Sequence, residues 1–151
     1  MKELRVTPIK NGTVIDHIPS GMALKVLKIL GISEKVSSTV TVAIHVPSKK
    51  TQWKDILKVE DRELNPREVD KIALIAPTAT VNVIRNYNVA EKRRVVLPEK
   101  AVGILKCGNP NCITNQREPI ETVFLVNNKM PLTLKCRYCD RAIEDVAAAI
   151  I

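Results

Sequence analysis

The 151-residue sequence contains few aromatic side chains: one Trp, two Tyr and one Phe make up 3% of it. Sheets that bind single-stranded RNA usually stack bases on aromatic side chains of their central strands. Trp53, Tyr87, Phe124 and Tyr138 are scattered, and no Lys/Arg-Gly-aromatic run is present. The sequence therefore argues against an aromatic RNA-binding platform and leaves phosphate binding by lysine and arginine open.

Long apolar runs and catalytic motifs are also missing. No apolar run approaches the roughly 18 residues of a membrane-spanning helix. There are two histidines, no Gly-rich phosphate loop and no serine or cysteine in a nucleophile motif, so we expect no enzymatic activity. Residues 1–15 lack the charged start and apolar run of a secretory signal, which favours a cytoplasmic protein with reduced thiols.

The sequence is basic, with 24 Lys and Arg against 16 Asp and Glu and a formal net charge of +8. Such a charge suits a nucleic-acid-binding protein. It also suits a protein that binds small polyanions such as nucleotides. A lysine-rich solvated surface without a partner is the third interpretation, and charge does not choose among them.

All four cysteines lie in one stretch, spaced Cys107-x4-Cys112-x23-Cys136-x2-Cys139. Two close pairs form two turns that can hold one tetrahedral metal, and four thiolates predict a closed, structural zinc site. Two disulfides are the first alternative, which the lack of a secretory signal disfavours. A redox pair with two bystanders is the second, but such a pair is expected early, just after a strand, without a second pair nearby. Basic neighbours are expected to keep the sulfurs deprotonated. These are Lys106, Lys135, Arg137 and Arg141.

Residues 1–97 read as strand, helix, strand, strand, helix, strand, which predicts an α+β, ferredoxin-like split βαβ sandwich: an antiparallel sheet with both helices on one face. Residues 4–18 are predicted to form a strand pair or one long strand broken at Asn11-Gly12. A helix capped by Ser20 ends at Gly31 and is apolar enough for burial on more than one side. The remaining predicted elements are strands 39–46, 52–60 and 79–89 and a helix that starts at Asn65-Pro66 and stops at Pro77.

Two strand segments carry the histidines. Alternation over residues 39–46 places Val40, Val42, Ile44 and Val46 on one face and His45 on the other, with residues 47–50 as the turn. We expect this histidine to be partly exposed and structural.

The second histidine follows an acidic residue at the end of the first predicted strand. Asp16 and His17 are adjacent strand residues, which predicts opposite faces and no catalytic dyad, although either could contact a ligand.

Residues 98–151 form a second predicted domain, a small all-β zinc ribbon that follows a hinge at Leu97-Pro98-Glu99. About fifty residues give a marginal apolar core, so metal binding is expected to supply much of the folding free energy. Strands are predicted at residues 102–105, 120–126 and 132–134. Residues 143–151 have helical propensity, but a strand suits a small ribbon better.

Several segments together resemble one family. They are Gly12 to Pro19, Ala76 to Asn82 with Asn86-Tyr87, Leu97-Pro98-Glu99, and the cysteine pattern. Their combination looks like the regulatory chain of aspartate carbamoyltransferase, and the resemblance covers nearly the whole sequence.

This resemblance implies a non-catalytic chain in pyrimidine biosynthesis. An allosteric domain would bind nucleotide effectors, CTP as inhibitor, ATP as activator and UTP as a further candidate. A domain holding one zinc ion would dock on the catalytic chain, and regulatory dimers would join catalytic trimers in a dodecamer. The alternatives are a basic zinc-ribbon protein that binds nucleic acid and a free-standing nucleotide sensor.

The resemblance also implies an effector site, in which lysines would neutralise phosphates and apolar side chains would flank the base or ribose. Carried over by position, the site comprises Ile9, Val14, Asp16, His17, Lys58, Asn82, Ile84, Tyr87, Val89 and Lys92. Thr7-Pro8 departs from well-known bacterial members, which have an acidic residue followed by a non-proline. Because Pro8 has no backbone N–H, this departure bears on which nucleotide is preferred.

Overall fold

A computed structural model describes residues 8–32, 37–117, 120–127, 129 and 132–151. The chain divides into two compact units. The first comprises Met1–Asn65 and Thr78–Val95, and the second comprises Pro66–Pro77 and Val96–Ile151. Among the described residues, no helix is long and apolar enough to cross a membrane.

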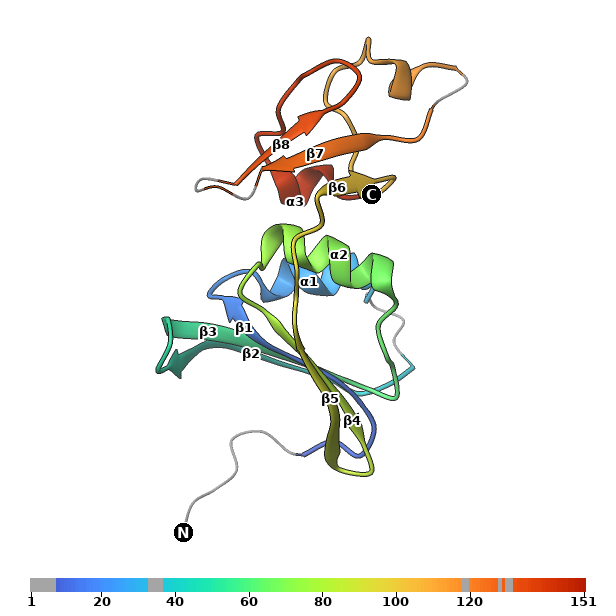
Figure 1. The fold of residues 1–151 in the computed structure, drawn as a ribbon. Coiled ribbons are helices and arrows are strands. Elements are labelled where there is room, and N and C mark those ends of the chain that lie inside the picture. Colours follow the sequence, from blue (N-terminus) through green and yellow to red (C-terminus); the bar gives the residue numbers. More distant parts are fainter. Residues whose placement is uncertain (1–7, 33–36, 118–119, 128, 130–131) are drawn as a thin grey trace. The chain divides into compact units, whose positions relative to one another are not determined.

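The first unit is built on a five-stranded antiparallel sheet with the strand order β2-β3-β1-β4-β5 (Figure 1). Its strands are β1 (Gly12–Pro19), β2 (Val40–Ser48), β3 (Gln52–Glu60), β4 (Thr80–Arg85) and β5 (Asn88–Arg94). Helix α1 (Ala23–Ile29) follows β1, and helix α2 (Pro66–Ile75) follows β3. The predicted antiparallel α+β class is confirmed, and β3 has the bounds that the sequence indicated. The predicted strand over residues 4–18 begins outside the described residues.

The single strand predicted over residues 79–89 is wrong, because the chain turns back at Asn86-Tyr87 and forms the hairpin of β4 and β5. Both turn residues have positive φ, 52° and 65°. Two consecutive residues of this kind form a tight hairpin turn whose twist suits antiparallel strands, and asparagine tolerates this conformation well.

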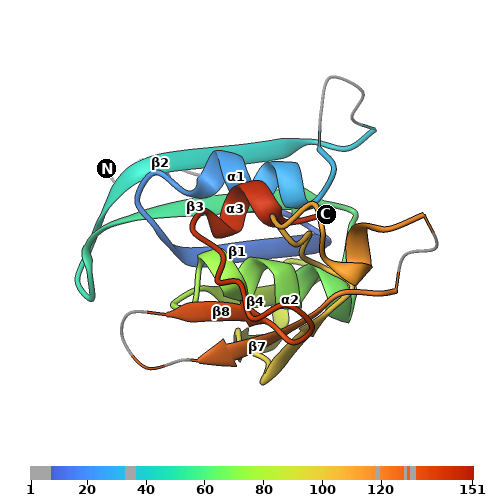
Figure 2. The same cartoon turned by 90° about the horizontal axis from the view of Figure 1, so that it is seen from above.

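Helix α1 lies over the β2 and β3 side of the sheet, as both views show (Figures 1 and 2). It ends as predicted: Gly31 has a φ of 69°, its N–H donates to the Lys28 carbonyl, and the Ile32 N–H donates to the Leu27 carbonyl, a Schellman motif. The predicted Ser20 cap is wrong, because the N-cap residue is Met22. The prediction that this helix is buried on more than one side is also wrong, since Leu24 is 63% exposed.

Strand β2 does not alternate as predicted. Its register with β3 shifts between Ala43 and Val46, and His45 has a φ of 62° in this β-bulge. The bulge leaves Ile44 50% exposed, so Ile44 is not on the buried face with Val42. The strand also continues through Ser48, which moves the predicted turn to residues 49–51.

The second unit contains a three-stranded antiparallel sheet in the order β6-β7-β8. Its elements are β6 (Lys100–Val102), the 3₁₀ turn η1 (Ile113–Asn115), β7 (Val123–Asn127), β8 (Thr133–Cys136), helix α3 (Val146–Ala149) and α2. One buried cluster joins them. It includes Leu74, Ala101, Leu105, Phe124 and Leu134.

Three strand predictions for this unit had the wrong bounds. The strand predicted at residues 102–105 ends at Val102, because Gly103 turns the chain with a φ of 69°. The second begins only at Val123, and the third extends to Cys136. Residues 146–149 are helical and not a strand, because the Asp145 side chain caps the turn by accepting the Ala148 N–H.

We expect Gly12→Ala to destabilise the first unit by about 3 kcal/mol or more, among the larger effects of single substitutions. Gly12 has a φ of 143°, and a Cβ there would lie 2.2 Å from the Val59 carbonyl oxygen. Gly21→Ala is the matched control, since Gly21 has a φ of 92° with nothing within 4 Å, and should cost roughly 1–2 kcal/mol. Urea unfolding measures both; equal effects would show that the close approach to β3 contributes nothing.

Candidate metal centre and effector site

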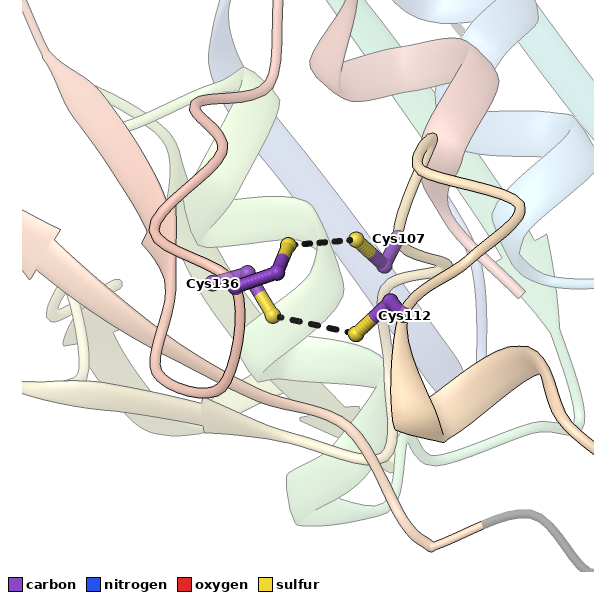
Figure 3. A group of neighbouring side chains, drawn as sticks. Cys107, Cys112 and Cys136 are labelled. Carbon is purple, nitrogen blue, oxygen red and sulfur yellow. Dashed lines mark hydrogen bonds between the residues drawn. The ribbon is translucent and has the colours of Figure 1, made fainter.

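The four cysteines converge from two turns of the second unit. Cys107 and Cys112 precede η1, Cys136 ends β8, and Cys139 lies in the turn that follows. All four Sγ atoms lie within 4.8 Å of one another. The Cys107 and Cys139 sulfurs are 3.5 Å apart. Those of Cys112 and Cys136, on the two facing turns, are 3.8 Å apart (Figure 3).

These distances fit a tetrahedral zinc site. Zinc–thiolate bonds of about 2.3 Å place the sulfurs of a regular tetrahedron about 3.8 Å apart. Cys107, Cys112 and Cys136 are buried and Cys139 is partly buried. Four sulfurs in this arrangement leave no coordination position for a substrate, so the site can link two turns but has no room for chemistry.

Hydrogen bonds act directly on the sulfurs. The Thr114 hydroxyl donates to Cys112 Sγ over 3.2 Å and lowers the pKa of that thiol. A backbone N–H from Arg141 lowers the pKa of the Cys139 thiol to about 7, whereas burial raises the pKa of the Cys107 thiol to about 12. Loading the site removes all four thiol protons, so donors placed at the sulfurs favour the loaded form.

Two of the basic side chains that were predicted to keep the sulfurs deprotonated contact other groups. The Arg141 guanidinium donates to the Gly108 carbonyl oxygen over 3.2 Å, and the Lys135 ammonium lies 3.9 Å from Asp140. Backbone N–H groups and the Thr114 hydroxyl lower the thiol pKa values directly, and the contribution of the basic side chains stays a prediction.

Most of the predicted effector residues lie on the face of the five-stranded sheet that points away from α1, here called the outer face (Figure 1). Directly paired residues share a face, and Lys58, Val14, Asn82 and Lys92 are paired in turn across β3, β1, β4 and β5. They form one row across the sheet. Burial lowers the pKa of the Lys58 ammonium, and the Asn82 amide donates to the Val14 carbonyl over 3.4 Å.

The neighbouring row of the outer face, toward the β4–β5 turn, is apolar. Ile84 pairs with Gly12 and with Val89, which places Ile84 and Val89 in the next row of the outer face. Tyr87 lies in the hairpin turn beyond them, and its N–H donates to the Lys10 carbonyl, next to the buried Ile9. Tyr87 and Val89 are 65% and 58% exposed, so both are available to a ligand.

The outer face is polar on the other side of the row, and here one prediction is wrong. A β-bulge between Ile15 and Ile18 gives His17 a φ of 56°, so Asp16 and His17 do not point to opposite faces. The His17 Nδ1 atom lies 3.9 Å from an Asp16 carboxylate oxygen and 2.8 Å from the Thr80 hydroxyl. The predicted exposure of His45 is confirmed.

Two family models, for two domains of one protein family, match the chain. One describes the aspartate carbamoyltransferase regulatory chain, allosteric domain, and matches residues 4–96. The other describes the metal binding domain of the same chain and matches residues 99–148. The protein belongs to the aspartate carbamoyltransferase regulatory chain family.

Curated regulatory chains from archaea are similar over nearly their full length. That of Pyrococcus horikoshii is 58% identical over 146 residues, which cover 96% of this chain and 95% of the relative. The regulatory chain of Methanothrix thermoacetophila is 55% identical over 144 residues, 95% of this chain and 94% of the relative. That of Thermoplasma volcanium is 52% identical over 144 residues, 95% of each chain.

Membership settles two predictions. The relatives are named as regulatory and not catalytic chains, which confirms a non-catalytic subunit. The C-terminal part of the regulatory chain is a metal-binding domain, and zinc is the metal of this family, which confirms the predicted cofactor.

Two contacts of the predicted effector residues were missed from the sequence. The Lys54 ammonium lies 3.0 Å from an Asp16 carboxylate oxygen, and Thr80 contacts His17. The place of Lys54 on the outer face could have been predicted, because residues 54 and 58 of one strand share a face. Thr80 could be found only from the register of β1 with β4.

We expect His17 of the regulatory chain to titrate below its ordinary pKa of 6.5. Burial lowers this pKa most, Lys54, Lys50 and Lys92 lower it further, and Asp16 opposes them. The folded state then binds fewer protons than the unfolded state, so stability present at neutral pH is lost as the pH falls below about 6.5. NMR titration of the imidazole, assigned with His17→Asn, measures the effect; a midpoint above 6.5 would contradict it.

Proposed function

We propose that the regulatory chain binds nucleotide effectors on the outer face of an allosteric domain, residues 1–97. The metal-binding domain, residues 98–151, then transmits the signal to the catalytic chain of aspartate carbamoyltransferase. The observation that carries this proposal is the row in which Lys58 and Lys92 stand on either side of Val14 and Asn82.

The row has the dimensions and chemistry of a nucleotide site. Neighbouring strands lie about 4.8 Å apart, so the three steps from β3 to β5 separate the two lysines by about 14 Å at their Cα atoms. Flexible ammonium side chains can converge on phosphates from that separation. An anion there would also offset the burial of Lys58.

The surfaces on either side of the row suit the other parts of a nucleotide. Ile84, Val89 and Tyr87 offer apolar surface to a base, while Asn82 and Asp16 supply directional hydrogen bonds to ribose or base edges. CTP, ATP and UTP are the candidate effectors. Pro8, which precedes the buried Ile9, has no backbone N–H to donate to a base, and this bears on which base is preferred.

In the metal-binding domain, Cys107, Cys112, Cys136 and Cys139 hold one structural zinc ion per chain. The fold that this ion stabilises docks on the catalytic chain, and two regulatory chains associate as a dimer in a cytoplasmic complex. Effector binding and the catalytic equilibrium are coupled by about 1–3 kcal/mol, and the coupling is reciprocal.

Co-purification with the catalytic chain, with and without a zinc chelator, combined with equilibrium binding of CTP and ATP, tests the proposal. We expect chelator-sensitive co-purification and nucleotide binding by the full chain. Nucleotide binding without co-purification would instead identify a free-standing sensor. Affinity for RNA or DNA that falls steeply with salt, without nucleotide binding, would favour the nucleic-acid alternative that the net charge of +8 allows.

A further inference from the structure

Two β-bulges face each other across β3. On one side, β1 pairs Ile15 with Leu57 and Ile18 with Asp55, so two β1 residues stand opposite one β3 residue. On the other side, β2 pairs Ala43 with Ile56 and Val46 with Lys54, again two residues against one. Bulges of this kind bend a strand and redirect its side chains.

The two bulges share a sequence pattern. Each contains a histidine that is followed by a β-branched aliphatic residue and then by proline: His17-Ile18-Pro19 in β1 and His45-Val46-Pro47 in β2. Both histidines have positive φ, 56° and 62°, which is uncommon for residues other than glycine. Surrounding contacts must therefore hold both bulges in place.

The carboxylate of Asp55 supplies such contacts. Asp55 is completely buried on β3, between the two bulges. Its Oδ1 atom accepts the His45 N–H over 2.9 Å, and its Oδ2 atom accepts the N–H groups of Gly21 and Ala23 over 2.9 and 3.1 Å. One carboxylate thus joins the β2 bulge to the turn between β1 and α1.

A second contact also links the β2 bulge to the β1–α1 turn. The His45 Nδ1 atom lies 3.1 Å from the Ser20 hydroxyl, in the same β1–α1 turn that Asp55 holds. The His45 ring also stacks on Trp53 of β3, with ring centroids 3.9 Å apart and an angle of 14° between the planes. Together these contacts of Asp55 and His45 fix where the chain leaves β1, directly after the bulge that orients His17.

We propose that Asp55 is a positioning residue for the effector site, an inference that rests on the proposed nucleotide-binding function. Asp55 faces the core side of the sheet and acts through the β1–α1 turn: it sets the exit of β1, and thereby the place of His17 beside Thr80 and Asp16 on the outer face. The same carboxylate accepts the His45 N–H and so links the β2 bulge to the β1–α1 turn.

Asp55→Asn in the full chain is the test, because it keeps the size of the side chain but cannot accept all three N–H groups. In the nucleotide-free chain we expect the NMR titration midpoint of His17 to move toward 6.5, since its surroundings loosen. Calorimetric affinity for CTP, corrected for the folded fraction, should fall about tenfold, or about 1.4 kcal/mol.

Thr13→Val is the matched control. Thr13 is also completely buried in the sheet, and its hydroxyl donates to the Arg62 carbonyl over 2.6 Å, so its loss costs a buried hydrogen bond without touching the β1–α1 turn. We expect lower stability but an unchanged His17 midpoint. An Asp55→Asn protein that behaves in the same way would show that Asp55 is only structural and would overturn the proposal.

Asp55→Glu, which keeps the charge but displaces it, is made in parallel in case Asp55→Asn does not fold. In the unmodified chain, CTP should slow hydrogen exchange of the Gly21, Ala23 and His45 amides, because positioning and binding are reciprocal. Unchanged exchange on a chain that binds CTP would overturn the proposal. If the chain binds no CTP, the proposed function fails, while the His17 titration in nucleotide-free variants still decides the role of Asp55.

Discussion

Cys139→Ser is expected to unfold the metal-binding domain and to abolish co-purification with the catalytic chain, while the outer face still binds nucleotide. Structural zinc supplies roughly 10–16 kcal/mol of binding free energy in small domains, far more than a core of about fifty residues provides. Cys139 is the least buried of the four cysteines and lies outside the strands, so its replacement disturbs metal binding more than packing. Metal content, circular dichroism and co-purification measure the three consequences.

Thr114→Val provides a graded control, because it removes only the hydroxyl that donates to Cys112 Sγ. Loss of such a supporting contact typically lowers metal affinity about 10- to 100-fold, so this variant should keep its zinc until a chelator competes for it. A Cys139→Ser protein that remained folded, metal-free and bound to the catalytic chain would contradict a structural metal site.

Lys92→Ala is expected to weaken nucleotide binding about tenfold or more and to leave zinc content and assembly unchanged. Charge-assisted hydrogen bonds to phosphate contribute roughly 1.5–3 kcal/mol, and Lys92 lies at the end of the outer-face row. It is exposed on β5, so its removal leaves no cavity. Calorimetric titration with CTP and ATP measures the loss.

Arg93→Ala is the matched control for charge. Arg93 is the next residue of β5 and pairs with Val81, a core residue, so its side chain leaves the sheet on the opposite face. Both substitutions remove one positive charge, but only Lys92→Ala removes it from the proposed site. Equal losses of affinity would indicate general attraction by net charge, and an unchanged affinity in Lys92→Ala would exclude Lys92 from the site.

Local chemistry made several elements predictable from the sequence. Asn65-Pro66 marked the start of α2 because proline suits the first helical position, and Gly31 marked the end of α1 because the Schellman motif needs positive φ. The cysteine spacing located the metal centre, since two close pairs of thiols can meet only around a shared ion or in disulfides. In each case a few neighbouring residues determine the conformation.

The bulges at His17 and His45 could not be predicted in this way. Histidine adopts positive φ more often than most residues but still uncommonly, and each bulge depends on pairing with β3 across the sheet. The fully buried Asp55 looked like an ordinary polar strand residue, because its three N–H partners lie 10 to 34 positions away. The hairpin at Asn86-Tyr87 was missed because the apolar residues on both sides resemble one continuous strand.

The effector residues are an intermediate case. Resemblance to a family supplied their names, and no property of the sequence alone would have placed Lys58 and Lys92 in one row. Strand register did so, because three consecutive pairings across four strands must agree before residues of β3 and β5 share a face.

The most direct test is the activity of the catalytic chain reconstituted with this regulatory chain, measured at subsaturating substrate with and without CTP or ATP. We expect the nucleotides to change the activity of the complex, to have no effect on the catalytic chain alone, and to lose potency when the complex contains Lys92→Ala. A fully assembled, zinc-loaded complex whose activity does not respond to either nucleotide would contradict an allosteric role for the outer face.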